Sequence, residues 1–287
     1  MQYVITSISI GSIYALIAVG FALIFSVMNL SNFSHGSIMA IGAYIGYLLV
    51  KAGINPLLSV LVTMFSCAAL AAFIELVLFR RIRKKSSAPI YLFVASVTLL
   101  MLLTNVLILI FGGKSVVFPS LFEVPYIVVK DVYISKISIV VTAVAIVLLL
   151  LLEWFLFKTK YGIAIRAAAQ DRRACSLMGC NVDLIITLVF ALAGLLGGCG
   201  GFFLGISYSV YPRLGNIIGK AFVATVIGGM GSIKGAIIGA FILGIVEVAV
   251  NYFFGSVYVA VFVYAIAIAF MIIRPQGIAG VKIDNKA

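Results

Sequence analysis

Long apolar runs separated by short charged stretches constrain this chain more than any other feature. Of its 287 residues, 64% are apolar and only 10% are charged, whereas a water-soluble domain is about half apolar and about a quarter charged. This composition excludes an ordinary soluble domain, and it also excludes a disordered chain, because disorder requires few apolar residues. The runs therefore predict an all-α polytopic membrane protein.

Nine segments are candidates for membrane spans, with a plausible count between eight and ten. They cover residues 4–28, 35–50, 56–79, 90–111, 137–157, 185–206, 217–230, 235–253 and 257–273. The second and seventh are the shortest, which favours tilted, broken or partly re-entrant helices over plain spans. All nine form one transmembrane domain, residues 1–287, and the first run is too long for a signal-peptide core, so we expect it to be retained.

Lysine and arginine are distributed unevenly between the two alternating sets of connections. One set carries 14 of them, namely Arg80, Arg81, Arg83, Lys84, Lys85, Lys158, Lys160, Arg166, Arg172, Arg173, Lys234, Arg274, Lys282 and Lys286. The other carries 5, namely Lys51, Lys114, Lys130, Lys136 and Arg213. Because positive charge follows the cytoplasmic side, the N-terminus is predicted to lie outside and the C-terminus in the cytoplasm. The net charge of +12 then reflects membrane topology, and no nucleic-acid partner is expected.

Two connections are long enough to have structure of their own. Residues 112–136, between the fourth and fifth spans, contain β-branched and aromatic runs that predict a small extracytoplasmic pair of strands. Residues 158–184 predict two short cytoplasmic helices. Thr159 is placed to cap the first, Asp171 to cap the second, and Gly179 to end it.

Few ionisable residues lie within the apolar layer, where each is costly. Glu75 lies close to a basic cluster, so we expect it to reach the membrane interface. Glu247 lies deeper, with Asn251 one turn further on, and a hydrogen bond between helices is its expected role. The single His and the four Cys lack metal-ligand spacing. This scarcity argues against an ion-coupled carrier and against a channel with charged rings.

Glycine is patterned as well as abundant. Glycines recur every four residues at 197, 201 and 205 and again at 231, 235 and 239, which favours close helix packing. The sequence GSIMAIGAYI at 36–45 is similar to GSIKGAIIGAFI at 231–242. A parallel internal duplication would explain this similarity.

Four segments, in order along the chain, resemble the permeases of branched-chain amino acid ABC importers. They are residues 11–44 (GSIYALIAVGFALIFSVMNLSNFSHGSIMAIGAY), 159–183 (TKYGIAIRAAAQDRRACSLMGCNVD), 220–247 (KAFVATVIGGMGSIKGAIIGAFILGIVE) and 274–280 (RPQGIAG). The chain is similar to the shorter, high-affinity permease of the pair. The resemblance implies a multi-pass permease of the bacterial cytoplasmic (inner) membrane that carries Leu, Ile, Val or related aliphatic amino acids.

The resemblance also implies partners. These are two ABC ATPase subunits, a second homologous permease or a second copy of this chain, and an extracytoplasmic substrate-binding protein. ATP and Mg would be bound by the ATPases, and no cofactor is expected on this chain. The sequence agrees with that division, because no stretch completes a nucleotide-binding loop.

Two groups of site residues follow from the resemblance. For coupling to the ATPases, within 158–184, they are Gly162, Arg166, Ala167, Asp171, Ala174 and Gly179. For the substrate path they are Asn29, Asn32, His35, Gly36 and Ser37 in the first half and Gly228, Gly229, Gly231 and Ser232 in the second. A broken helix there would offer free N–H and C=O groups to a zwitterion. The chain departs from the family pattern at Arg172 and Arg173, where relatives often have a proline and an acidic residue, and these two arginines are best explained as positive-inside charge.

Other functions stay open at the level of sequence. Permeases of the same family that carry urea or short amides resemble the chain as well. A secondary transporter driven by an ion gradient would transport its solute without an ATPase. A membrane-embedded enzyme would need a cluster of nucleophile, base or metal ligands, which one His and eight scattered acidic residues do not favour.

Overall fold

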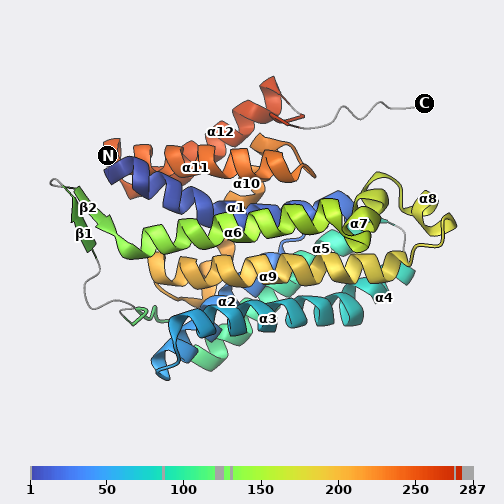
Figure 1. Cartoon of the computed structure of the whole chain (residues 1–287), viewed down its shortest axis with the longest axis horizontal. Helices are drawn as coiled ribbons and strands as arrows, with labels where there is room; N and C mark the ends of the chain where they lie inside the picture. The colour runs from blue at the N-terminus through green and yellow to red at the C-terminus, as the bar shows by residue number, and fades with distance from the viewer. Residues whose placement is uncertain (1, 86–87, 120–125, 130–131, 275, 280–287) are drawn as a thin grey trace.

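The computed structural model describes residues 2–85, 88–119, 126–129, 132–274 and 276–279. Most of them are helical (Figure 1). The helices are α1 (Gln2–Met28), α2 (Ser34–Lys51), α3 (Pro56–Ile74), the π-helix η1 (Glu75–Phe79), α4 (Arg80–Lys85), α5 (Pro89–Phe111), α6 (Lys136–Lys158), α7 (Lys160–Gln170), α8 (Arg172–Leu177), α9 (Val182–Tyr208), the 3₁₀ helix η2 (Pro212–Ile217), α10 (Ile218–Gly228), α11 (Ile233–Phe253), the 3₁₀ helix η3 (Ser256–Tyr258) and α12 (Val259–Ile273). Two strands, β1 (Tyr126–Val129) and β2 (Val132–Ser135), pair antiparallel.

Seven helical segments of the described chain are long and apolar enough to cross a membrane. They are α1, α3 continued through η1 and α4, α5, α6, α9, α11, and η3 continued by α12. This confirms the polytopic α-helical class. The predicted count of about nine is not reached, because α2 and α10 do not qualify. These are the two segments whose shortness in the sequence indicated incomplete or broken spans, and α10 has only 11 residues.

Helix α1 forms the centre of the bundle. In its most apolar window 83% of the residues are buried, against 11% for α5 and 17% for the segment that contains α12. Helix α1 packs against α6, α9, α10 and α11. Figure 1 shows it between the other long helices. Because α5 and α12 are apolar and yet exposed, their outer faces suit contact with lipid.

Glycines allow the closest helix crossings. A Cβ added at Gly201 of α9 would overlap the backbone carbonyl of Met39 on α2. A Cβ at Gly239 of α11 would overlap the carbonyl of Ala224 on α10. The prediction that the glycine series serve helix packing is therefore confirmed at these positions.

The two helices that fall short of a span are linked through η2. A Cβ at Gly36, in the first turn of α2, would overlap the carbonyl oxygen of Gly215 in η2. Helix α10 begins directly after η2, at Ile218. The start of α2 and the start of α10 thus meet inside the bundle rather than at its ends.

The bundle has two distinct ends (Figure 1). The N-terminal residues and the β1–β2 hairpin lie at one end, called here the hairpin end, and α4, α7 and α8 lie at the other. The strand pair lies within the segment 112–136, where the sequence predicts one. The basic residues of α4, α7 and α8 therefore lie at the same end of the bundle, as a topology of alternating spans requires. Lys130, Lys282 and Lys286 lie outside the described residues.

Candidate functional site

The first predicted part of the substrate path lies in the connection from α1 to α2. Asn32 is almost fully buried, and its Oδ1 accepts hydrogen bonds from the backbone N–H of Ser34 (3.2 Å) and from the Ser34 hydroxyl (2.6 Å). The hydroxyl of Ser37 donates to the Ser34 carbonyl at 2.7 Å. Asn29 is exposed and has a φ of 50°. These polar groups mainly stabilise the break in the chain and the first turn of α2.

His35, in the same segment, is fully buried where α1, α2 and α9 meet. A Cβ at Gly20 would lie 3.0 Å from its Nε2, and a Cβ at Gly197 would lie 2.5 Å from its Cε1. Neither ring nitrogen has a hydrogen-bond partner among the described residues. His35 and Gly36 therefore lie in helix packing, with His35 filling the space that two glycines leave open.

The second predicted part lies between α10 and α11. The Ser232 hydroxyl accepts from the backbone N–H of Gly235 at 3.1 Å and so caps α11. Gly229 and Gly231 have φ values of 110° and 84°, which favour glycine. Gly231 lies beside Phe25, in the last turns of α1. The structure thus brings the two predicted parts to neighbouring positions around the end of α1.

Only some of these residues face open space. A cavity of about 700 Å³ lies between α1, α6, α7 and α11, and both Gly231 and Ser232 line it. Gly228 instead packs against the backbone of Gly235. The residues predicted between Asn29 and Ser37 do not line this cavity.

Helix α7 is fixed tightly to the end of α6. The Thr159 hydroxyl accepts from the backbone N–H of Gly162 at 3.0 Å, which confirms the predicted cap. A Cβ at Gly162 would overlap the backbone of Leu156, so the glycine permits this close approach. Arg166 donates from Nε to the Leu156 carbonyl at 3.1 Å, and its guanidinium lies 4.5 Å from the centre of the Phe157 ring. Ala167 is half-buried in the same helix.

Helix α8 is short and well capped. Oδ1 of Asp171 accepts from the backbone N–H of Arg173 (2.7 Å) and of Ala174 (3.1 Å). These two backbone donors, Ala174 foremost, hold the pKa of the Asp171 carboxyl below its usual range. Gly179, with a φ of 84°, ends the helix as predicted.

The outer face of α8 is apolar and uncovered. Leu177 and Met178 are 89% and 84% exposed, and Ala174 is also exposed. Cys175 faces inward, and burial raises the pKa of its thiol to about 11. Gly162, Arg166, Asp171 and Gly179 therefore build a rigid frame, whereas the exposed face is formed by α8 and its C-terminal end.

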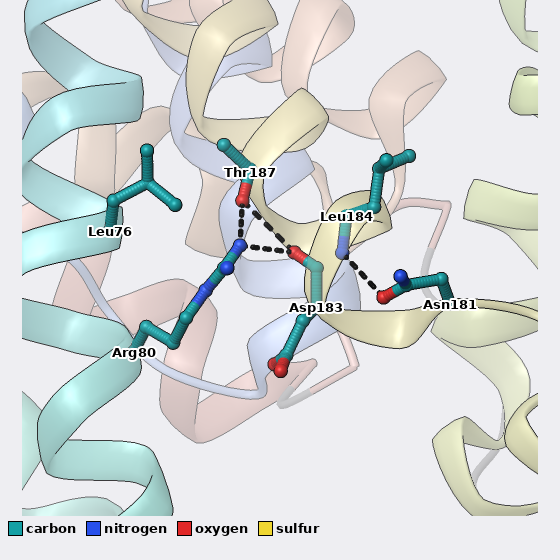
Figure 2. A pocket seen from close by; sticks show the side chains of 6 residues that line it. All are labelled: Leu76, Arg80, Asn181, Asp183, Leu184 and Thr187. Carbon is teal, nitrogen blue, oxygen red and sulfur yellow. Dashed lines mark hydrogen bonds between the residues drawn. The ribbon is translucent and has the colours of Figure 1, made fainter.

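A network of charges ties the start of α9 to the α3–α4 segment (Figure 2). Glu75 has no exposed surface and accepts from Arg83 (3.1 Å), Arg80 (3.4 Å) and the Thr187 hydroxyl (2.7 Å). Arg83 also pairs with Asp183 at 2.6 Å. Figure 2 shows Arg80 extending to Thr187 and to the backbone carbonyl of Asp183, at 2.6 Å and 3.1 Å.

This network corrects one prediction from the sequence. Glu75 was expected to reach the membrane interface, but it is buried inside the bundle. The expectation was wrong because two arginines and a threonine bring their donors to the carboxylate, so it does not need water. Arg80, Asp183 and Thr187 also line a small cavity of about 350 Å³ beside α9.

A second buried ion pair lies nearer the hairpin end. Lys220 of α10 donates from Nζ to Oε1 of Glu247 on α11 at 2.7 Å and to the hydroxyl of Tyr14 on α1 at 3.1 Å. The hydroxyls of Tyr14 and Tyr208 donate to Glu247 at 2.7 Å and 3.1 Å. The predicted helix-to-helix hydrogen bonding of Glu247 is confirmed. Its pairing with Lys220 was missed, although a lysine inside an apolar segment was a signal for it.

These features define a class of protein. Apolar helices with exposed faces, two buried charge networks and cavities between helices are typical of a membrane transport subunit. In the part of the chain that the structure describes, no three His, Cys, Asp or Glu side chains are grouped so that they could hold a metal ion.

Comparison with known proteins then identifies the family. Residues 3–273 match the family described as branched-chain amino acid transport system / permease component, and the chain belongs to it. The chain is 32% identical to the high-affinity branched-chain amino acid transport system permease protein LivH of Salmonella typhimurium, over 98% of this chain and 95% of that protein. It is 30% identical to the corresponding protein BraD of Pseudomonas aeruginosa, over the same shares. A probable LivH of Methanocaldococcus jannaschii is 31% identical, over 94% of this chain and 89% of that one.

No solved structure matches the chain. The family match confirms the resemblance found in the sequence and identifies the chain as a membrane permease component rather than an enzyme. Permeases of this kind are proteins of the inner membrane, which agrees with the seven membrane-capable segments.

Proposed function

We propose that this chain is the permease subunit of an ATP-binding-cassette importer for Leu, Ile, Val or related aliphatic amino acids. The observation that carries this proposal is the match to branched-chain amino acid permeases along almost the whole chain. A substrate-binding protein would deliver the solute, two ATPases would drive transport, and a second permease or another copy of this chain would complete the path. ATP and Mg would reside on the ATPases.

The end that carries α4, α7 and α8 would face the cytoplasm. Arg80, Arg81, Arg83, Lys84 and Lys85 are gathered there in and beside α4, and positive charge is retained on the cytoplasmic side. The N-terminus and the β1–β2 hairpin would then be extracytoplasmic.

The connection 158–184 would be the element that docks onto an ATPase. Leu177 and Met178 form an apolar face outside the spans, and such a face is costly in water unless a partner covers it. The caps of α7 and α8 and the anchoring of Arg166 to α6 keep this face in a fixed position. A short rigid helix that inserts its apolar side into a groove is a common recognition mode.

The inner part of the substrate path is proposed at the cavity lined by Gly231 and Ser232. Asn32, His35 and Gly36 would act indirectly, by holding α1, α2 and α9 around it.

Uptake of labelled leucine by cells that lack the chromosomal copy and express this chain from a plasmid tests the proposal. We expect uptake to require the chain and to continue when the proton gradient is dissipated while ATP is maintained. Leucine uptake that is independent of the chain, with labelled urea uptake dependent on it, would reassign the substrate to an amide. Transport by the purified chain alone would contradict the ATPase-driven mechanism.

Docking is tested separately with Leu177→Asp and Met178→Asp. Each should reduce co-purification with the ATPase and uptake, because a charge replaces a side chain that a groove must bury. Ser176→Asp is the matched control, since it adds the same charge to the same helix without removing an apolar contact. Equal loss in all three variants would assign the effect to charge rather than to the apolar face.

A further inference from the structure

The Lys220–Glu247 pair lies at the wall of a large cavity. This cavity has a volume of about 930 Å³, within the range of small-molecule sites, about 300–1,000 Å³. It is lined by residues of α1, α6, α9, α10, α11, η3 and α12, including Gln2, Ile137 and Ser256. These three lie near the helix ends of the hairpin end, so the cavity is placed toward that end of the bundle.

The pair is partly satisfied within the protein and partly available to a ligand. Nζ of Lys220 uses two of its three N–H groups in the hydrogen bonds to Glu247 and Tyr14, and it also lies 5.5 Å and 6.0 Å from the ring centres of Tyr14 and Tyr208. No third hydrogen-bond acceptor for Nζ is found among the described residues. The Lys220 side chain keeps 21% of its surface exposed, whereas that of Glu247 keeps 9%. An ammonium N–H therefore remains for an acceptor that enters the cavity.

Keeping two opposite charges at this depth is costly. An isolated charge in the apolar layer is unfavourable, and a buried ion pair is often no more stable than apolar side chains of the same size. The hydroxyls of Tyr14 and Tyr208 reduce this cost by donating to Glu247. Helix packing alone would not require charged side chains at these positions. A solute that carries one positive and one negative group, by contrast, is best bound by one protein group of each sign.

The remaining lining includes aliphatic side chains among polar and aromatic ones. Ile10, Ile206, Val248 and Val259 line the cavity, together with the small polar residues Thr6, Ser9 and Asn251. The lining thus combines one ion pair with aliphatic and small polar side chains. This arrangement matches a small molecule with a zwitterionic head and a branched apolar tail.

We propose that Lys220 and Glu247 form a binding site for the zwitterionic head of an α-amino acid, with Lys220 binding the carboxylate and Glu247 the ammonium group. This proposal rests on the proposed function and adds the solute-contacting residues, on the side where a binding protein would release its cargo. On binding, one ion pair within the protein is exchanged for two pairs with the solute, so net charge is conserved. Tyr14 and Tyr208 keep Glu247 oriented during the exchange.

Equilibrium binding to the purified full chain in nanodiscs tests this site with three ligands. Leucine carries both charges, 3-methylbutylamine lacks the carboxylate, and 4-methylvalerate lacks the ammonium group. In Lys220→Met, leucine should bind about 10- to 100-fold more weakly, the value of one charge-assisted hydrogen bond, whereas 3-methylbutylamine should bind at least as tightly as before, because Glu247 no longer pairs with Lys220. In Glu247→Gln, leucine should again bind more weakly, and 4-methylvalerate should bind at least as tightly as before, because Lys220 no longer pairs with a carboxylate of the protein.

The controls separate recognition from folding. Lys51→Met makes the same substitution at an exposed lysine at the end of α2 and should leave all three affinities unchanged. If Lys220→Met does not fold, Lys220→Arg keeps the positive charge and should retain leucine binding, while Tyr14→Phe should weaken it.

Two results would overturn the site. The first is an equal loss of all three ligands in Lys220→Met, which would assign the pair to structure. The second is the absence of saturable leucine binding by the wild-type chain while cellular leucine uptake still depends on it. If uptake did not depend on the chain, the proposed function would fail instead, so the two failures are distinguishable.

Discussion

Glu75 offers the sharpest test of how the bundle is held together, and we predict that Glu75→Gln destabilises it strongly. The substitution keeps the shape of the side chain but removes the charge that Arg83 and Arg80 contact at 3.1 Å and 3.4 Å. A hydrogen bond to a charged group contributes about 1.5–3 kcal/mol. Arg83 retains Asp183, and the contact with Arg80 is long, so we expect a loss of about 2–4 kcal/mol rather than the full sum.

The assay is the free energy of unfolding of the purified chain in mixed micelles with increasing SDS. Glu153→Gln is the matched control, because Glu153 pairs with Lys234 at 3.6 Å and both side chains are more than half exposed. That control should cost less than about 0.5 kcal/mol, as exposed ion pairs usually do. If the two variants were equally stable, the buried network would not stabilise the fold and our reasoning would be wrong.

Three further predictions concern packing, capping and access. Gly36→Ala should lower the free energy of unfolding by about 1–3 kcal/mol, because the new methyl group would overlap the Gly215 carbonyl, whereas Gly113→Ala, in open space, should not. Asp171→Ala should speed amide hydrogen exchange in α8, and Asp171→Asn should preserve the cap. Because the folded-state pKa of Asp171 is lowered, its contribution should be complete above its unfolded pKa and be lost as the pH falls through the folded value. A protection factor of the α8 amides (the intrinsic exchange rate divided by the observed rate) that stays constant in acid would contradict this. Cys180, the one partly exposed cysteine, should react with a membrane-impermeant maleimide before the three buried cysteines do. It should react only after the cells are permeabilised, and labelling of Cys180 in intact cells would contradict the proposed orientation.

Local features of the fold were predictable from the sequence. Thr159, Asp171 and Gly179 act at the ends of α7 and α8 as predicted, because capping depends on residues only two to four positions apart. The shortness of α2 and α10 was also visible, because span length follows directly from the length of an apolar run. Such signals need no knowledge of tertiary contacts.

The charge networks could not be derived in the same way. Tyr14 and Glu247 are 233 positions apart, and Thr187 and Glu75 are 112 positions apart. A single sequence shows that an acid in the apolar layer needs a partner, but it does not show which distant residue supplies it. The same limit applies to His35, because its packing against Gly20 and Gly197 on two other helices is not visible in the sequence, and its place on the substrate path stays a prediction.

Helix α9 connects the two regions for which we propose functions. It begins at Val182, after the short connection 178–181 that follows α8, and its first turns carry Asp183 and Thr187, which bind the α3–α4 segment. Its last residue, Tyr208, bonds to Glu247 in the cavity near the hairpin end. With 27 residues, it spans about 40 Å as a single helix. If α8 docks onto an ATPase as we propose, its displacement would reach the Lys220–Glu247 pair through one continuous helix, without a relay of side chains across the bilayer.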